Sequence, residues 1–230
     1  MTNLAEIIRS RGHWHVNLHP ATFDENRIGS LAELERAFRE AHVQLRGWDY
    51  PHEPREGASR HKDFIEGSVS WEDRHEIWRI YQSCQFVHLF AMPEDWLQES
   101  GWGPTNTEKG QLLEVGRTLF TVTEIFVFAA RLVEALRLGP EVLLSYKLVG
   151  VENRQLQTLD RGRVPLGSWR KAAPDLHEYG DKLKLPVPTL IAGAPDLAVD
   201  QVMAIYERFH WEPARQSVVE EQRRLLERRL

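Results

Sequence analysis

Three histidines stand close together near the amino terminus, in the segment HWHVNLHP. Imidazole nitrogens are common zinc ligands, and they also carry acid–base chemistry near neutral pH. Alternate residues of a strand share one face, so His13, His15, Asn17 and His19 would form a row with neighbours about 6.6–7 Å apart. Two imidazoles at that spacing can converge on one metal ion.

A metal-dependent hydrolase or nuclease is therefore one hypothesis, with Asp49 from a following loop as a further ligand of the histidine row. The simpler interpretation is that Trp14, Val16 and Leu18 face the core while the histidines face water. The sequence lacks the H-E-x-x-H spacing and the paired C-x-x-C segments of common zinc sites. We therefore expect a solvated strand face and no cofactor, and we keep a divalent metal as the alternative.

The segment RGWDYPH, residues 46–52, holds a second candidate site. Asp49 could orient the imidazole of His52 for acid–base work, and loops at strand ends often carry functional residues. An aspartate before an aromatic residue and a proline is also ordinary turn chemistry, with Pro51 fixing the bend. We favour the structural interpretation.

The segment WRIYQSCQFVH places four polar side chains on one face of an expected strand: Arg79, Tyr81, Ser83 and Gln85. Buried polar groups need partners, so these residues are expected to line a pocket or form an internal network. Ser83 and His88 would point to opposite faces, which argues against a nucleophile and its base. Cys84 is expected to be buried and unreactive.

A basic run follows between residues 154 and 171, where one acid accompanies five cations and a tryptophan. Arginine beside an aromatic ring suits phosphate contact combined with base stacking. The alternative is a solvated loop that neutralises acidic neighbours. The nucleic-acid hypothesis names these residues: Arg154, Arg161, Arg163, Trp169, Arg170 and Lys171.

Three segments carry a resemblance to a known group of proteins: RGWDYPH, EIWRIYQSCQFVHLFAMPEDW and LLEVGRTLFTVTEIFVFAARL. Together they resemble a family of uncharacterised bacterial proteins over residues 45–133. The family has no known activity, so no functional residue is carried over. The resemblance implies a bacterial protein with an accessory role.

The elements that would position these residues follow from hydrophobic periodicity. Helices are expected over 4–11, 31–41, 112–138, 196–209 and 213–230, and the third is apolar on nearly every side, as a buried helix is. Strands are expected over 13–19, 43–48, 77–92 and 182–193, and 141–151 with 154–160 would form a hairpin. The glycine-rich segment 94–110 is a candidate binding loop or lid.

This order predicts an α+β fold: a mostly antiparallel sheet with a long buried central helix and flanking helices. We expect one domain over 1–230, with a weak boundary near 139–140. A net charge of −5, a single cysteine and no secretory signal predict a soluble cytoplasmic protein without a membrane segment. The leading functional hypothesis is a non-enzymatic binding module that recognises a protein or nucleic acid.

Overall fold

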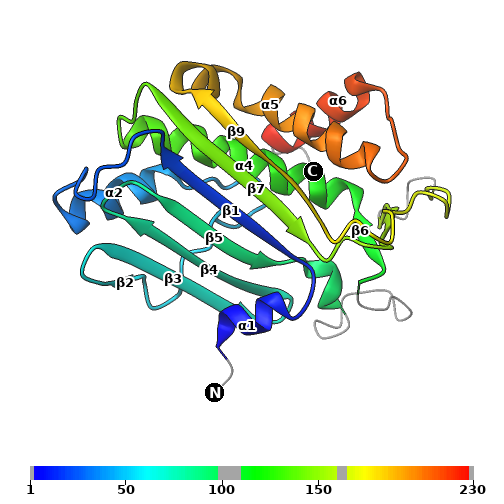
Figure 1. Cartoon of the computed structure of the whole chain (residues 1–230), viewed down its shortest axis with the longest axis horizontal. Helices are drawn as coiled ribbons and strands as arrows, with labels where there is room; N and C mark the ends of the chain where they lie inside the picture. Colours follow the sequence, from blue (N-terminus) through cyan, green and yellow to red (C-terminus); the bar gives the residue numbers. More distant parts are fainter. Residues whose placement is uncertain (1–2, 98–109, 160–164, 228–230) are drawn as a thin grey trace.

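Seven antiparallel strands form the main sheet in the computed structural model, which describes residues 3–97, 110–159 and 165–227. The strand order is β2-β3-β4-β5-β1-β7-β9, so the first strand of the chain lies inside the sheet (Figure 1). The strands are β1 His13–Pro20, β2 Ser59–Arg60, β3 Phe64–Trp71, β4 Arg74–Tyr81, β5 Phe86–Ala91, β7 Glu141–Val149 and β9 Glu178–Pro186.

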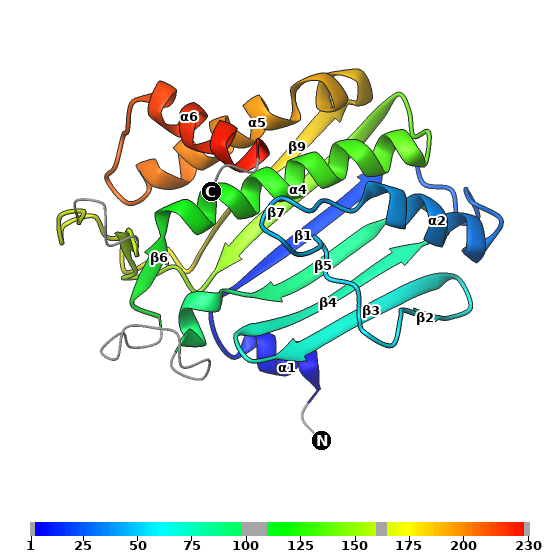
Figure 2. The ribbon, with the colours of Figure 1, turned by 180° about the vertical axis from the view of Figure 1, so that it is seen from behind.

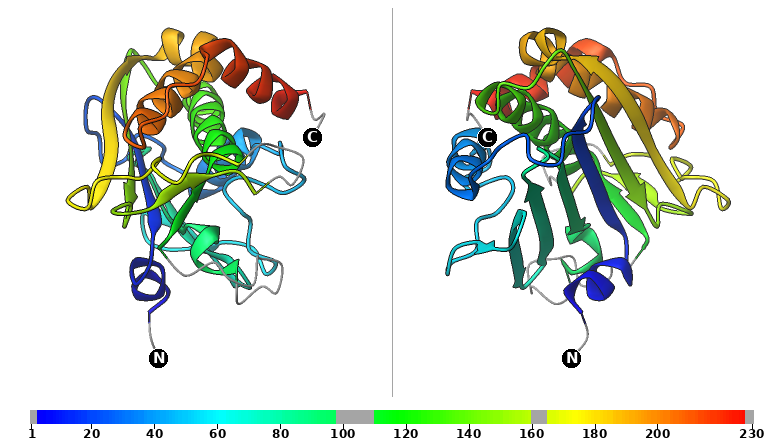
Figure 3. Two further views of the ribbon diagram at one scale, coloured as in Figure 1. Left: turned by 90° about the vertical axis from the view of Figure 1, so that its right-hand side faces the viewer. Right: turned by 60° about the vertical axis from the view of Figure 1, so that its left-hand side comes forward.

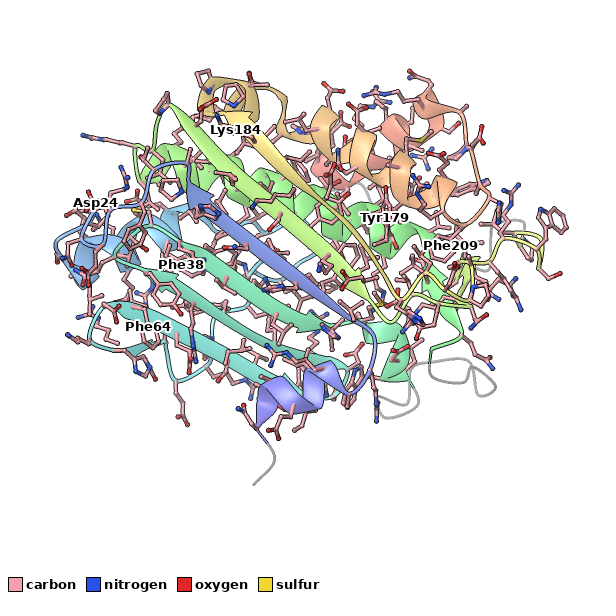
Figure 4. The ribbon with its side chains drawn as sticks, viewed as in Figure 1. Asp24, Phe38, Phe64, Tyr179, Lys184 and Phe209 are labelled. Atoms are coloured by element: carbon pink, nitrogen blue, oxygen red, sulfur yellow. The ribbon has the colours of Figure 1, made fainter. Side chains whose placement is uncertain are left out.

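Among the described elements, four helices lie on one face of this sheet, the side that Figures 2 and 3 bring into view. They are α2 Leu31–Ala41, α4 Val115–Ala135, α5 Val187–Glu207 and α6 Arg215–Leu226. The opposite face, here called the open face, carries the short helix α1 Leu4–Arg9 at one end, where Ile8 packs against Leu89 and Ala91. Figure 4 shows Phe64 and Lys184 near opposite edges of the sheet. The predicted α+β fold with a mostly antiparallel sheet is confirmed.

The central helix is buried as its sequence predicts, because α4 packs between the sheet and the helices α2, α5 and α6. Glu124 lies in the middle of α4 and is fully buried. A buried carboxylate needs a cation, and Arg46 supplies it through two hydrogen bonds to Glu124. Leu138 and Val142, on either side of the weak boundary expected near 139–140, belong to the same core.

The expected strand over 77–92 is wrong, since β4 and β5 are two strands of a hairpin. The chain reverses over 82–85, where the Tyr81 amide donates to the Gln85 carbonyl at 2.9 Å. Cys84 takes a positive φ of 64° in this turn, which contains no glycine, asparagine or aspartate. The turn separates the four polar residues predicted to share a strand face.

Three other expectations fail at their pairing or their boundaries. Gln155–Gln157 (β8) pairs in parallel with Leu112–Glu114 (β6) and does not form a hairpin with β7. The expected strand over 43–48 reduces to a single bridge between Val43 and Tyr50. The expected strand over 182–193 ends at Pro186, where α5 begins, although β9 is an edge strand as its prolines suggested.

A buried ion pair joins three distant parts of the chain. Arg154 binds Asp95 with both terminal nitrogens, at 2.8 and 2.6 Å, and both side chains are almost fully buried. Asp95 also accepts hydrogen bonds from the amides of Gly12 and Gly110. Arg154 is therefore a structural cation held in the interior, and its prediction as a nucleic-acid contact is corrected.

Among the described helices, each is too short or too polar to span a membrane. The segment predicted as a lid, 94–110, begins with the short helix η1 Pro93–Asp95. Residues 98–109 of that segment lie outside the described residues.

Candidate functional site

A cavity of about 70 Å³, here called the inner cavity, lies on the helix-covered side of the sheet. Its described wall comes from four parts of the chain: the segment 46–52, the start of β4 with Asp73, the end of β5 with Pro93, and the first half of α4. The hairpin that joins β3 to β4 brings Arg74 and Glu76 to this place, and α4 contributes Arg117 and Thr121.

Glu76 is the centre of a hydrogen-bonded cluster beside the inner cavity. Its carboxylate is buried and contacts two imidazoles: Nε2 of His88 lies 2.7 Å from Oε2, and Nδ1 of His52 lies against Oε1. Beyond His88, its Nδ1 lies 3.3 Å from the hydroxyl of Tyr50. Beyond His52, its Nε2 lies 2.7 Å from Nη1 of Arg74. The cluster is a continuous chain of polar groups with the carboxylate at its middle.

The protonation states of this cluster follow from burial and hydrogen bonding. Burial raises the pKa of Glu76, but hydrogen bonds from His52 and His88 outweigh burial and bring that pKa down to about 2. Burial lowers the pKa of His88, against the opposing effect of Glu76. Burial also raises the pKa of Tyr50 well above its usual value. At neutral pH Glu76 is charged and His88 is neutral. Tyr50 is protonated, so its hydroxyl can donate a hydrogen bond to Nδ1 of His88.

Three arginines line the inner cavity: Arg46, Arg74 and Arg117. Arg46 is paired with Glu124, whereas Arg117 lies 3.9 Å from an oxygen of Glu94. Burial raises the pKa of Glu94, which weakens it as a counter-charge for Arg117. The guanidinium of Arg74 stacks over the Trp48 ring at 3.8 Å.

Arg74 is the least compensated of these cations. Its guanidinium donates to the imidazole of His52 rather than to a carboxylate. Burial lowers the pKa of Arg74, Asp73 opposes that effect, and Arg46 lowers the pKa further. A half-buried cation close to two others is a place where an added negative charge is stabilised.

A wider groove of about 950 Å³, here called the outer groove, shares part of its wall with the inner cavity. Trp48, His52, Asp73 and Arg74 line both spaces. The outer groove runs between the 53–59 segment and the β3–β4 hairpin, where the Trp71 side chain is 54% exposed. The inner cavity therefore has an adjoining open space through which a ligand can approach.

The histidine row and Asp49 lie on opposite faces of the sheet and do not form one site. His15 and His19 lie on the open face, whereas Asp49 hydrogen-bonds Gln44 in the segment that covers the other face. His13 lies in the same row, but it is buried at the end near α1 and its Nδ1 contacts the Arg11 carbonyl. Within residues 3–97, 110–159 and 165–227, no three His, Cys, Asp or Glu side chains are placed to hold a metal ion.

Of the second predicted site, His52 belongs to the inner cavity, but its carboxylate partner is Glu76 and not Asp49. The first strand of the third predicted site carries Arg79 and Tyr81 on the open face, where Arg79 pairs with Glu66 at 2.6 Å. Ser83 and Gln85 lie at the turn instead, and Gln85 donates to Asn17. The predicted pocket of these four residues is not formed.

Burial raises the pKa of the Cys84 thiol to about 11, which supports its interpretation as an unreactive core residue. In the basic run, Arg161 and Arg163 lie outside the described residues. Trp169 is 69% exposed, Lys171 is exposed, and Arg170 donates to the His210 carbonyl at 2.5 Å. These three remain at the surface.

Prediction from the sequence missed Glu76, His88 and Arg74 as site residues. Two of them, Glu76 and His88, could have been identified from their positions in the strand pattern. Glu76 is in phase with Trp78 and Ile80 on β4, and His88 is in phase with Phe86 on β5. A charged or titratable residue in phase with a buried strand face needs an internal partner. Comparing the chain with family models, curated proteins and solved structures gives no match, so the site stands on its geometry.

Proposed function

We propose that the protein binds a small ligand through an oxyanion group, a carboxylate or a phosphate, in the inner cavity. The observation that carries this proposal is the half-buried guanidinium of Arg74, which is held by an imidazole nitrogen and an aromatic ring. Arginine presents a rigid fork of donors that matches the two oxygens of such groups. Arg117, which lies 3.9 Å from an oxygen of Glu94, is placed to add a second set of donors.

The surroundings of Arg74 favour an organic ligand over a bare ion. Trp48 and Phe90 line the inner cavity, and Trp71 stands at the outer groove. Ligand sites typically combine apolar walls with a few placed polar groups. The anionic end would lie in the inner cavity and the rest of the molecule in the outer groove, which is the larger space.

Sulfate and acetate test the anion site, since they present tetrahedral and planar oxyanions without other recognition elements. At ten times its Kd, either ion should stabilise the fold by about 1.4 kcal/mol. The expected rise in Tm is roughly 3–6 °C for a chain of this size. Arg74→Gln and Arg117→Gln should each reduce this rise strongly, at constant ionic strength.

The matched control is Arg36→Gln, because Arg36 lies on the exposed side of α2 and pairs loosely with Glu40. That variant should respond to both ions as the unmodified protein does. Sulfate stabilises many proteins by exclusion from their surfaces. Equal stabilisation of the control and of Arg74→Gln would therefore show general exclusion and remove the anion site.

Nucleic-acid binding is a second proposed function, and the exposed Trp169 beside Arg170 and Lys171 supports it. Trp169→Ala should weaken single-stranded binding more than duplex binding, since stacking contributes about 1–3 kcal/mol per base. Affinity should fall by roughly 0.7–0.9 log units per log unit of salt for each phosphate contacted. In a gel-shift titration, Lys182→Glu on β9 is the control. If Lys182→Glu weakens binding as much as Trp169→Ala does, the effect reflects net charge and not stacking on Trp169.

A further inference from the structure

Two imidazoles share the carboxylate of Glu76, but only His52 reaches the solvent. The His88 side chain is fully buried, whereas the His52 side chain is 23% exposed and lines both the inner cavity and the outer groove. A proton can therefore reach His52 without opening the core. If one histidine of this pair changes its protonation state on ligand binding, the structure selects His52.

The hydrogen bonds of His52 define which nitrogen carries its hydrogen. Nε2 lies 2.7 Å from Nη1 of Arg74, which can only donate, so Nε2 must be an accepting lone pair. Because Nε2 accepts, the ring hydrogen is on Nδ1, which lies against a carboxylate oxygen of Glu76. The accepting nitrogen of the ring faces the same space as the guanidinium.

The backbone at His52 is held in place from the sheet. The indole nitrogen of Trp78 donates to the His52 carbonyl at 2.9 Å. The ring of Trp78 occupies the position that a side chain at residue 67 on β3 would need, because a Cβ at Gly67 would lie 2.2 Å from it. The backbone that carries the imidazole is therefore fixed relative to β4.

An oxyanion on Arg74 changes the electrostatics of this contact. The anion competes for the Nη1 hydrogen that His52 now accepts, and it brings oxygen atoms close to Nε2. A lone pair facing an anionic oxygen is repulsive, whereas an N–H facing it is a charge-assisted hydrogen bond. Glu76 already lies at Nδ1 and stabilises the imidazolium that results.

We propose that the oxyanion binds together with one proton, which Nε2 of His52 takes up from solvent. This inference rests on the anion site proposed above and adds its coupling to pH. One N–H bond forms at Nε2, the Arg74 hydrogen bond moves from the imidazole to the anion, and no other bond changes. The bound ligand then faces a proton donor on one side and a guanidinium on the other.

Charged side chains from several segments line the two spaces that His52 faces. Among the described residues, the cations that line these two spaces are Arg46, Arg55, Arg74 and Arg117, and the anions are Glu53, Glu56, Glu66, Glu72, Asp73 and Glu76. Tyr50 and His75 also line the inner cavity, and His88 lies behind Glu76. Of the anions, Glu76 makes direct contact with the imidazole, so it is the group that balances the added proton.

Calorimetric titration with sodium sulfate tests the coupling, because sulfate itself takes up no proton near neutral pH. Titrations in buffers of different ionisation enthalpy give the number of protons bound with the ion. We expect the number of protons bound per sulfate to approach one for the unmodified protein and to be zero for His52→Gln. By linkage, the Kd for sulfate should rise with pH, by up to about tenfold per pH unit.

His177→Gln is the matched control, since His177 is an exposed histidine whose contact with Glu152 lies away from the cavity. That variant should keep both the affinity and the proton uptake. Should His52→Gln fail to fold, ¹⁵N spectra of the histidine side chains give the same answer, because sulfate should convert Nε2 of His52 from an acceptor to an N–H.

The outcomes separate the two proposals. No saturable sulfate binding would remove the anion site itself. Sulfate binding without proton uptake, or with an unchanged Nε2 signal, would keep the anion site and overturn the coupling. Proton uptake that persists in His52→Gln would assign the proton to another group and also overturn this inference.

Discussion

Replacing Asp95 by alanine should lower the free energy of unfolding by about 3–5 kcal/mol, the cost of breaking one partner out of a buried ion pair. The side chains of Asp95 and Arg154 are exposed by only 2% and 1%, so water cannot replace the lost carboxylate. The variant also leaves the Gly12 and Gly110 amides without their acceptor. Thermal or urea unfolding measures the effect, with an expected fall in Tm of roughly 6–20 °C.

Asp175→Ala is the control for this experiment, because Asp175 lies in an exposed turn between β8 and β9. It should change stability by no more than about 0.5 kcal/mol. If Asp95→Ala unfolds like the control, the junction that Asp95 makes between residues 12, 110 and 154 does not contribute to the stability of the fold.

The pair between Arg46 and Glu124 should show an asymmetric response to substitution. Arg46→Met leaves a fully buried carboxylate without a cation, and should cost about 3–5 kcal/mol. Glu124→Leu should cost less, since the Arg46 side chain is 16% exposed and can turn toward water. Replacing both residues at once should recover much of the loss, because similar apolar groups often substitute well for a buried pair.

Glu178→Ala serves as the comparison, since it breaks an exposed ion pair with Lys147. Such pairs typically contribute about 0–1 kcal/mol. Urea unfolding of the four variants at neutral pH gives the required free energies. Equal costs for Arg46→Met and Glu178→Ala would contradict the view that α4 depends on a compensated charge at its centre.

Periodicity predicted the helices better than the strand pairings. The apolar pattern between 112 and 138 located α4, whose buried Glu124 requires an internal cation. The cation itself, Arg46, lies 78 residues away in sequence, and its pairing depends on a loop that no local pattern fixes. The turn over 82–85 was missed because its positive φ falls on a cysteine instead of a glycine or asparagine.

The candidate site shows the same division between local and long-range information. His52 was identified from its neighbours in RGWDYPH, and its burial next to aromatic residues follows from that segment. Its partner was assigned to Asp49 because Asp49 is close in sequence, whereas Glu76 reaches it through the β3–β4 hairpin. Side chains that meet across a sheet are joined by strand register, and register requires the whole topology.

The central position of β1 has a consequence for how the chain folds during synthesis. β1 pairs with β5 and with β7, and the register joins Val16 to Tyr146 about 130 residues later. A ribosome adding about 5–20 residues per second needs roughly 6–26 s to cover that interval. Until then one edge of β1 lacks its partner, so the nascent chain spends this period with an open strand edge that chaperones or other chains can contact.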